Sequence, residues 1–326
     1  MKKKIALVTG GYSGEAVISY KTADTIYKHI DRSLYDCYLI DIHPNGWFYK
    51  PEGGEQSLVD KNDFSVIHHG EKITFDAVLI ALHGTPGEDG KLQGYLDCLN
   101  IPYTSCNTAT SAITFNKKYT VAVAAASGIR VANSIQLFKN ESYNSSEIID
   151  KLRLPVFVKP NNGGSSLGMS KVNEAVHLDA AIQKAFREDD QVLIESFIRG
   201  REFTIGVFRS GGNIITLPIT EIVSKNEFFD FEAKYQGASE EITPASVDES
   251  IANAIRETAK KAYHVFNCSG VVRIDFIYEE EAGVPFMLEI NTVPGQSDAS
   301  IVPQQVRAMG WTLSRFYSEL IESCLK

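Results

Sequence analysis

The apolar positions in the first hundred residues fall into short runs separated by segments with helical spacing. The runs at residues 4–11 (KIALVTGG), 37–42 (CYLIDI) and 75–84 (FDAVLIALHG) predict buried strands, and residues 14–29 predict a helix. Strands that alternate with helices predict a parallel sheet whose ligand-binding loops follow the carboxyl ends of the strands. We therefore expect an N-terminal α/β domain over residues 1–110.

The pattern changes after this first domain. The segment NKKYTVAVAAASG predicts a helix that ends at Gly128, and the runs VFVKP and DQVLIESFI predict strands. Between these two strands, KV continues a strand, and Asn173 is expected to cap a helix that runs to Phe186. Together these elements predict a small α+β domain over residues 111–198, which carries a glycine-rich loop.

Long strands dominate the remaining residues, 199–326. REFTIGVFR and NIITLPITEI predict strands, a helix is expected from about Asp248 to Phe266, and GVVRIDFIY and PFMLEINTV predict a hairpin before a terminal helical region. The stretch NEFFDFEAKYQGASEEITPAS lacks a regular pattern but is rich in aromatic residues, which favours an active-site lid over disorder. The predicted fold class is α/β and α+β, with three domains in series.

Composition and charge narrow the class of protein. The 326 residues include 32 Lys and Arg against 41 Asp and Glu, a net charge of −9, which argues against a nucleic-acid or anionic membrane surface. No run approaches the roughly 20 apolar residues that span a bilayer, and the apolar run after MKKK is too short for a signal peptide. The five cysteines are scattered and odd in number, which predicts reduced thiols in the cytoplasm.

The predicted hairpin carries the sharpest chemical signal. Side chains alternate between the faces of a strand, so Arg273 and Asp275 share one face, as do Glu289 and Asn291. Adjacent strands would bring two carboxylates and an amide together on an apolar sheet, an oxygen set that suits magnesium and ligand phosphates. A salt bridge between Arg273 and one acid on a solvent face explains the spacing equally well, so the hairpin alone leaves both interpretations open.

A loop of glycines, serines and asparagines follows the strand that ends near Lys159. Gly163 and Gly168 have the spacing that opens a Walker A motif, but Met169 and Ser170 stand where that motif requires Lys and then Ser or Thr. What remains is a flexible loop whose backbone N–H groups can contact phosphate, with Lys159 supplying charge. An exposed turn with incidental lysines is the alternative.

Lys117 and Lys118 open the predicted helix that ends at Gly128. The helix dipole disfavours cations at this end unless an anion binds there, so the pair adds weight to a phosphate site. A solvated lysine pair on the surface is the alternative.

The N-terminal turn TGGYSGE suggests a rival function of a different class. With Asp41 ending the second strand, it partly matches the dinucleotide fingerprint, but Thr9 stands at the first glycine position. A nicotinamide-dependent oxidoreductase would leave the acids of the hairpin and the lysine-flanked loop without a role. His83, which follows a strand, is either a loop-stabilising residue or a substrate contact.

Taken in order, these segments resemble the ATP-grasp enzymes and, among them, the D-alanine–D-alanine ligases. The resemblance covers nearly the whole chain and rests on six segments: TGGYSGEAVIS, LHGTPGEDGKLQGYLDCLNIPYT, VFVKPNNGGSSLGMSKV, DFEAKY, GVVRIDF and LEINTVPGQSDASIVP. It implies an ATP-grasp fold with an N-terminal parallel α/β domain, a small central α+β domain and a C-terminal α+β domain. It also implies ligation of two D-alanines through D-alanyl phosphate for peptidoglycan synthesis, at the expense of ATP.

The resemblance further implies how this chain binds ATP and metal. Lys117 and Lys159 would contact nucleotide phosphates, and Lys234 would close onto the γ-phosphate. Glu195 would lie against the adenine and Glu202 would hold the ribose. Two Mg²⁺ ions, which Mn²⁺ can replace, would be held by a further set of residues: Asp275, Glu289 and Asn291.

The same resemblance implies residues for the two amino acids. Glu15 would bind the ammonium of the first D-alanine, with Ser165 and Tyr235 in a hydrogen-bond network beside it and His83 nearby. Arg273 would stabilise the developing oxyanion. The second D-alanine would be received by two residues of the final motif: Gly295 and Ser300.

Some positions depart from the family pattern. Asn116 and Val121 replace an aspartate and a basic residue that are common there, and we expect both to be peripheral. The segment Gln296–Ile301 differs from its usual form, which leaves D-serine or another amino acid as an alternative second substrate. Tyr235 in EAKY favours an amine nucleophile over D-lactate. An inactive ATP-binding regulator is a further alternative, opposed by the joint presence of the implied site residues, and a homodimer is expected from the family alone.

Overall fold

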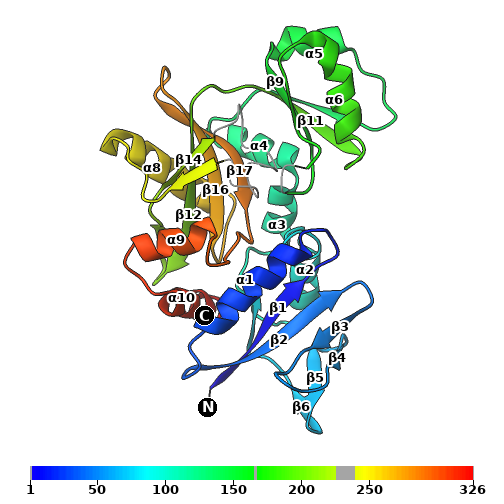
Figure 1. The fold of residues 1–326 in the computed structure, drawn as a ribbon, viewed down its shortest axis with the longest axis vertical. Helices are drawn as coiled ribbons and strands as arrows, with labels where there is room; N and C mark the ends of the chain where they lie inside the picture. Colours follow the sequence, from blue (N-terminus) through cyan, green and yellow to red (C-terminus); the bar gives the residue numbers. More distant parts are fainter. Residues whose placement is uncertain (1, 165–166, 225–238, 326) are drawn as a thin grey trace.

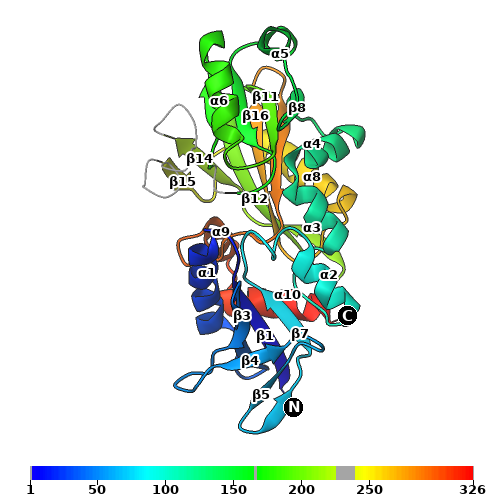
Figure 2. The same cartoon turned by 90° about the vertical axis from the view of Figure 1, so that its right-hand side faces the viewer.

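The computed structural model describes residues 2–164, 167–224 and 239–325. They form three sheets that follow one another along the chain (Figure 1). The seven-stranded sheet lies at one end of the molecule, the four-stranded sheet at the other, and the six-stranded sheet between them (Figure 2). Each sheet lies within one of the three predicted domain ranges, while the boundaries themselves stay a prediction.

The first sheet is built on the buried run of β1 (Lys3–Gly10). This strand pairs in parallel with β2 (Tyr35–His43) and β7 (Ala77–Ile80), as the alternation with α1 (Ala16–His29) predicts. The parallel pairing of the three predicted strands is confirmed, and four antiparallel strands of only three or four residues, which the sequence did not reveal, extend the sheet beyond β2: β3 (Gly46–Tyr49), β4 (Ser57–Asp60), β5 (Ser65–His68) and β6 (Glu71–Ile73). Such short strands give little periodic signal.

The second sheet is antiparallel and carries the glycine-rich loop between two of its strands. Its strands are β8 (Ser134–Phe138), β9 (Val156–Pro160), β10 (Ser170–Val172) and β11 (Gln191–Ser196), and its helices are α5 (Ser145–Leu152) and α6 (Leu178–Ala185). The predicted cap at Asn173 was wrong. A short 3-10 helix at Ala175–His177 intervenes, so α6 begins only after His177.

The third sheet is also antiparallel and contains the predicted hairpin. Its strands are β12 (Arg201–Ser210), β13 (Asn213–Thr216), β14 (Thr220–Ser224), β15 (Ser239–Ile242), β16 (Val272–Glu279) and β17 (Val284–Asn291). The run predicted as one strand, NIITLPITEI, divides into β13 and β14 around Pro218, which cannot donate a ladder hydrogen bond. The amphipathic helix α8 (Glu249–Val265) packs against β12, β16 and β17, close to the predicted bounds.

Three short helices connect the sheets. α2 (Lys91–Cys98) precedes α3 (Thr108–Phe115) and α4 (Lys117–Ala126), and both α3 and α4 pack against β17. Asn116 caps α4, because its side chain accepts a hydrogen bond from the Tyr119 N–H at 3.0 Å, as an aspartate also would. Gly128 follows the end of α4 with φ of +70°, a conformation that suits glycine.

The C-terminal helices return to the first sheet. α9 (Ile301–Ala308) lies against β12, and α10 (Leu313–Cys324) packs against β12 and also against α1 and β7 of the first domain. Phe316 and Tyr317 are fully buried in the same cluster as Ile5 and Leu7 of β1. No helix of the described chain has both the length and the apolar composition needed to cross a membrane.

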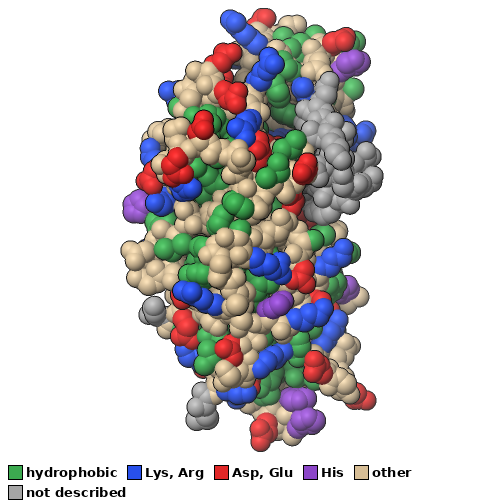
Figure 3. Space-filling model, turned by 60° about the vertical axis from the view of Figure 1, so that its left-hand side comes forward, with side chains coloured by type: hydrophobic (Ala, Val, Ile, Leu, Met, Phe, Trp, Pro, Cys, Tyr) green, Lys and Arg blue, Asp and Glu red, His purple; other side chains and the backbone are tan. Residues whose placement is uncertain are grey.

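The surface carries both signs of charge. On the face shown in Figure 3, Lys and Arg side chains alternate with Asp and Glu, and the described residues there form no continuous basic area. An interspersed pattern of this kind produces no strong local field.

Candidate active site

A cavity of about 790 Å³ lies where the three sheets meet. Twelve of the fifteen residues that the sequence predicts for the site line it: Glu15, His83, Lys117, Lys159, Glu195, Glu202, Arg273, Asp275, Glu289, Asn291, Gly295 and Ser300. The other three, Ser165, Lys234 and Tyr235, lie outside the described residues, as does the aromatic part of the predicted lid. The structure thus brings together every predicted site residue that it describes.

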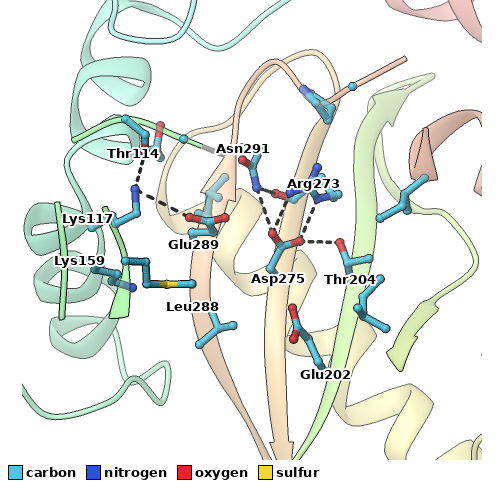
Figure 4. A pocket seen from close by; sticks show the side chains of 18 of the residues that line it. Thr114, Lys117, Lys159, Glu202, Thr204, Arg273, Asp275, Leu288, Glu289 and Asn291 are labelled. Atoms are coloured by element: carbon cyan, nitrogen blue, oxygen red, sulfur yellow. Dashed lines mark hydrogen bonds and ion pairs between the residues drawn. The ribbon is translucent and has the colours of Figure 1, made fainter. Parts of the chain in front are cut away.

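The hairpin places its polar side chains opposite one another. Arg273 of β16 pairs with Asn291 of β17, and Asp275 pairs with Glu289. After Asp275 the register shifts, and Leu288 is the extra residue of a bulge on β17. Bulges of this kind redirect nearby side chains, and here four polar groups face the cavity (Figure 4).

Asp275 is the most extensively hydrogen-bonded group of the hairpin. Its carboxylate accepts hydrogen bonds from Arg273 at 2.8 and 2.9 Å, from the Thr204 hydroxyl at 2.5 Å and from the Asn291 amide at 3.2 Å. The predicted salt bridge therefore exists. It does not lie on a solvent face, because the Arg273 and Asp275 side chains are only 19% and 12% exposed and line the cavity.

These residues fit a magnesium site. Two carboxylates from directly paired positions and one amide form a compact oxygen set, and magnesium typically takes one or two protein carboxylates and completes its shell with phosphates and water. Among residues 2–164, 167–224 and 239–325 there is no cluster of three or more His, Cys, Asp or Glu suited to a metal, so a site here depends on ligand oxygens.

Arg273 remains charged despite its burial. Burial alone would lower its pKa, but the neighbouring carboxylates of Asp275, Glu289 and Glu88 raise the pKa above its ordinary value. Two N–H groups of the Arg273 guanidinium donate to Asp275, and a guanidinium has five N–H groups in all. Arg273 can therefore hold Asp275 and still present a fixed positive charge to the cavity.

Two lysines reach the cavity from different elements. Lys117, the first residue of α4, donates to the Gly163 carbonyl at 2.5 Å and lies 3.9 Å from the Glu289 carboxylate (Figure 4). Lys159 of β9 pairs with Glu195 of β11 at 2.5 Å, with both side chains about nine-tenths buried. Because both lysine charges are largely buried at the cavity wall, an anionic ligand that lies between Lys117 and Lys159 would be favoured.

The glycine-rich loop approaches Glu15 closely. A Cβ at Gly164 would lie 2.6 Å from the Glu15 Oε1, and a Cβ at Gly84 would lie 2.6 Å from its Oε2. A side chain at either position would displace this carboxylate, and at Gly84 the φ of +65° also favours glycine. The N–H groups of Asn161 and Asn162 are bonded to β11 and Asp189, so ligand contacts fall to the loop from Gly163 onward.

His83 is held in place rather than free. Its ring Nε2 lies 3.0 Å from the Thr22 hydroxyl, its backbone N–H donates to Ser19, and the residue is 7% exposed. Burial and the nearby Arg273 charge lower the pKa of His83 to about 4, so the ring is neutral at pH 7. The loop-stabilising alternative for His83 is supported, because the residue ties its loop to α1; it also lines the cavity, and a substrate contact stays a prediction.

The neutral state of His83 gives stability a defined pH dependence. Its folded pKa lies below the unfolded value of 6.5, so its contribution is present at pH 7 and is lost as pH falls toward 4. Between pH 7 and pH 5, we expect the free energy of unfolding of the native protein to fall by about 2 kcal/mol more than that of His83→Asn, because one pKa unit corresponds to about 1.36 kcal/mol. Urea titrations of both proteins at both pH values measure the two decreases. Equal decreases in the native protein and in His83→Asn would contradict the prediction.

The last predicted segment forms the rim of the cavity before α9. Ser300 occupies the N-cap position of α9 without a capping hydrogen bond from its side chain, and its hydroxyl lies 2.7 Å from the Ser297 hydroxyl. A Cβ at Gly295 would lie only 3.0 Å from the Ser300 oxygen, which explains a glycine there. Backbone, two hydroxyls and a helix N-terminus thus face the same part of the cavity, a combination that suits a carboxylate.

Sequence reasoning missed Glu88 and Thr204. Glu88 lines the cavity and accepts a hydrogen bond from the Gly84 N–H at 2.6 Å; burial and the Glu15 charge raise the pKa of Glu88 to about 8. The only signal was its place in GEDG, directly after the predicted strand and five residues beyond His83. Thr204, which orients Asp275, lies inside an apolar strand and has no local signature.

Asp41, which suggested a dinucleotide site, has other partners. Its carboxylate accepts from the Tyr20 hydroxyl at 3.0 Å and pairs with Lys50 at 2.5 Å. The glycine turn before it instead leads the chain to Glu15 at the cavity.

Comparisons with known proteins agree with this geometry. Sequence profiles for the N-terminus and the C-terminus of D-ala D-ala ligase match residues 4–106 and 123–322. A D-alanine--D-alanine ligase of Flavobacterium johnsoniae is 45% identical over 323 residues, which is 99% of each chain. One from Azobacteroides pseudotrichonymphae is 47% identical over 323 residues, covering 98% of this chain and 99% of that one.

Solved structures show the same architecture. A D-Ala:D-Ser ligase from Enterococcus faecalis superposes with a TM-score of 0.89 at 31% identity, over 99% of both chains. A D-alanine--D-alanine ligase from Bacillus anthracis complexed with ATP gives 0.80 at 28% identity, over 99% of this chain and 97% of that one. The fold is therefore the ATP-grasp fold, and the chain belongs to the D-alanine–D-alanine ligase family.

Proposed function

We propose that this protein joins two D-alanines into D-alanyl-D-alanine, with cleavage of ATP to ADP and phosphate through D-alanyl phosphate, and so supplies peptidoglycan synthesis. The observation that carries the proposal is a cavity in which two lysines of the predicted central domain meet an arginine and the paired acids of the C-terminal hairpin, with Glu15 reaching it from the N-terminal domain. A site that must hold ATP and a carboxylate substrate together needs this balance of charges.

Nucleotide binding falls to the central and C-terminal domains. Lys117 and Lys159 are placed to contact phosphates, with Lys234 added from the segment outside the described residues. Glu195 and Glu202 line the same cavity and would face the adenine and the ribose. The Lys159–Glu195 ion pair fixes the lysine between β9 and β11, so little side-chain entropy is lost when phosphate binds.

Asp275, Glu289 and Asn291 would hold two magnesium ions, for which manganese can substitute. When bound, magnesium neutralises phosphate charge and so allows a carboxylate to approach. Asn291 and Thr204 keep the Asp275 carboxylate in one orientation, which prepares the set for binding.

The chemistry proceeds in two steps at the amino-acid end of the cavity. Glu15 binds the ammonium of the first D-alanine, whose carboxylate oxygen forms a bond to the γ-phosphorus while the bond to ADP breaks. The amine of the second D-alanine then attacks the acyl carbon, loses a proton, and phosphate leaves. Arg273 offsets the negative charge that develops on the carbonyl oxygen. Ser165 and Tyr235, which lie outside the described residues, are assigned to hydrogen bonds around Glu15 by the family resemblance alone. Because an acylphosphate hydrolyses in water, the site needs a lid.

Gly295 and Ser300 would receive the second amino acid, with its carboxylate at the start of α9. The unusual segment Gln296–Ile301 and the close structural match to a D-Ala:D-Ser ligase keep D-serine as a second candidate for this position. The side chains of Ser297 and Ser300 offer hydroxyl partners that either amino acid can use.

The test is ATP-dependent phosphate release with magnesium and different amino acids. D-alanine alone should release phosphate in step with D-alanyl-D-alanine, identified by mass, and L-alanine should release none. D-alanine with D-serine, and D-alanine with D-lactate, report on the second position. A dominant mixed product would keep the mechanism and change the second substrate, whereas no phosphate release with D-alanine would reject the proposal.

Lys159 gives a prediction specific to nucleotide binding. We expect Lys159→Met to raise KM for ATP by on the order of 10- to 100-fold, with a smaller change in KM for D-alanine, because phosphate loses one direct charge-assisted contact. Lys139→Met, which removes an exposed lysine paired with Asp190, is the matched control and should leave both constants unchanged. An unaltered KM for ATP in Lys159→Met would remove this lysine from the nucleotide site.

We place the protein in the cytoplasm, where ATP and free D-alanine are available, and as a homodimer. The scattered cysteines and the acidic surface support the first part, and family membership alone supports the second. Sedimentation at micromolar concentration tests the dimer.

A further inference from the structure

Thr22 lies outside the cavity, yet it connects the two ends of the amino-acid site. It is a fully buried residue of α1, the helix that begins beside Glu15. Its hydroxyl lies 3.0 Å from His83 Nε2 and accepts a hydrogen bond from the Gln296 N–H at 3.2 Å. These partners are 61 and 274 residues away in the sequence. One hydroxyl therefore links α1, the loop after β7 and the segment before α9.

The direction of the hydrogen bond to Gln296 follows from its donor. The Gln296 N–H can only donate, so the Thr22 oxygen accepts. Towards His83 Nε2 the Thr22 hydroxyl either donates its proton or accepts one, depending on which ring nitrogen carries the single N–H of the neutral imidazole.

Gln296 depends on this bond for its position. The residue is 2% exposed, and its side-chain Oε1 has no hydrogen-bond partner among the described residues. Its neighbours Gly295 and Ser297 line the cavity, whereas Gln296 itself lies behind the lining. At Gln296 itself the hydrogen bond to the N-terminal domain is made by the backbone N–H on Thr22, not by the oxygen of the side chain, and it adds to the packing of Val293 in the N-terminal core.

We propose that Thr22 is a positioning residue for the second amino-acid substrate: its hydroxyl fixes the 295–297 segment against α1 and His83. The inference rests on the proposed function for the identity of that substrate. The anchoring of Gln296 by Thr22 does not depend on the proposed function. Because Glu15 and Thr22 lie on the same helix, the anchor also sets the distance between the first and second substrates.

The test compares Thr22→Val, which keeps the volume but removes the hydroxyl, with Thr22→Ser, which keeps the hydroxyl. We expect Thr22→Val to raise KM for the second D-alanine at least 10-fold, with KM for the first D-alanine and for ATP changed less than about 3-fold, and Thr22→Ser to restore native values. Equal changes in all three constants would indicate a merely structural role and overturn the proposal, as would no change.

A second measurement does not require turnover. Hydrogen exchange of the Gln296 amide should be at least 10-fold faster in Thr22→Val and native-like in Thr22→Ser. Unchanged exchange overturns the anchor whatever the activity. Absence of D-alanine turnover in the native protein would instead reject the proposed function, and the exchange result would still decide the anchor. If Thr22→Val does not fold, Thr22→Cys, whose thiol is a weak hydrogen-bonding group, takes its place.

Discussion

Replacing Glu289 with alanine is expected to lower kcat by at least about 10³-fold while the fold is retained. Glu289 faces the cavity from β17, opposite Asp275, and its side chain is 27% exposed, so its removal deletes a proposed magnesium ligand and little core volume. Losing one of two carboxylates weakens the neutralisation of phosphate charge on which the attack of a carboxylate depends. Phosphate release at saturating ATP and D-alanine measures the effect.

The matched control for Glu289→Ala is Glu281→Ala, which removes an exposed carboxylate from the turn of the same hairpin. It should retain native activity and the same melting temperature. A further readout is magnesium titration of the rate: Glu289→Gln, which keeps one oxygen, should need more magnesium for half-maximal activity. Native turnover in Glu289→Ala would contradict the metal assignment.

Arg273→Ala should lower kcat by on the order of 10²- to 10³-fold, the usual effect of removing one group that stabilises a developing oxyanion. Arg273→Lys should recover only part of this loss, because an ammonium cannot hold Asp275 with two hydrogen bonds and also face the cavity. KM for ATP should change much less than kcat. Rates at saturating substrates, with product checked by mass, measure the difference.

The controls for Arg273→Ala must distinguish a decrease in kcat caused by the missing guanidinium from a decrease in activity caused by unfolding of the variant. Removing the guanidinium leaves the Asp275 carboxylate buried without its cation, which is destabilising by itself. Arg256→Ala removes a partly exposed arginine of α8, remote from the cavity lining, that pairs with the exposed Glu249, and it should leave kcat unchanged. If kcat of Arg273→Ala decreases only in proportion to the fraction of the variant that is folded, the catalytic role of Arg273 is excluded.

The elements that could be predicted from the sequence are those with a regular spacing of apolar residues. The buried runs of β1, β2 and β16 and the amphipathic helices α1 and α8 appear close to their predicted bounds. The antiparallel strands β3–β6 were missed because each has three or four residues, too few to establish alternation. The start of α6 was misplaced because a single polar residue cannot distinguish a cap from a 3-10 turn.

The candidate site was predictable to the extent that its residues belong to local patterns. Asp275 and Glu289 could be paired from strand alternation alone, and the register confirms that they lie opposite each other. The magnesium and salt-bridge interpretations could not be separated, because burial is a property of the packed sheet and not of the hairpin. Glu88 and Thr22 escaped notice because their roles depend on partners brought near only by the tertiary fold.

The return of α10 to the first sheet has a consequence for how the protein is made. The core beneath β1 includes Phe316 and Tyr317, and Lys3 is joined to Glu322 by hydrogen bonds of 2.9 and 3.0 Å. A chain emerging from the ribosome therefore exposes apolar surface of its N-terminal domain until α10 has been synthesised and has packed against β1. This domain is completed only after the two that follow it in the sequence, and its uncovered core is open to aggregation during that interval.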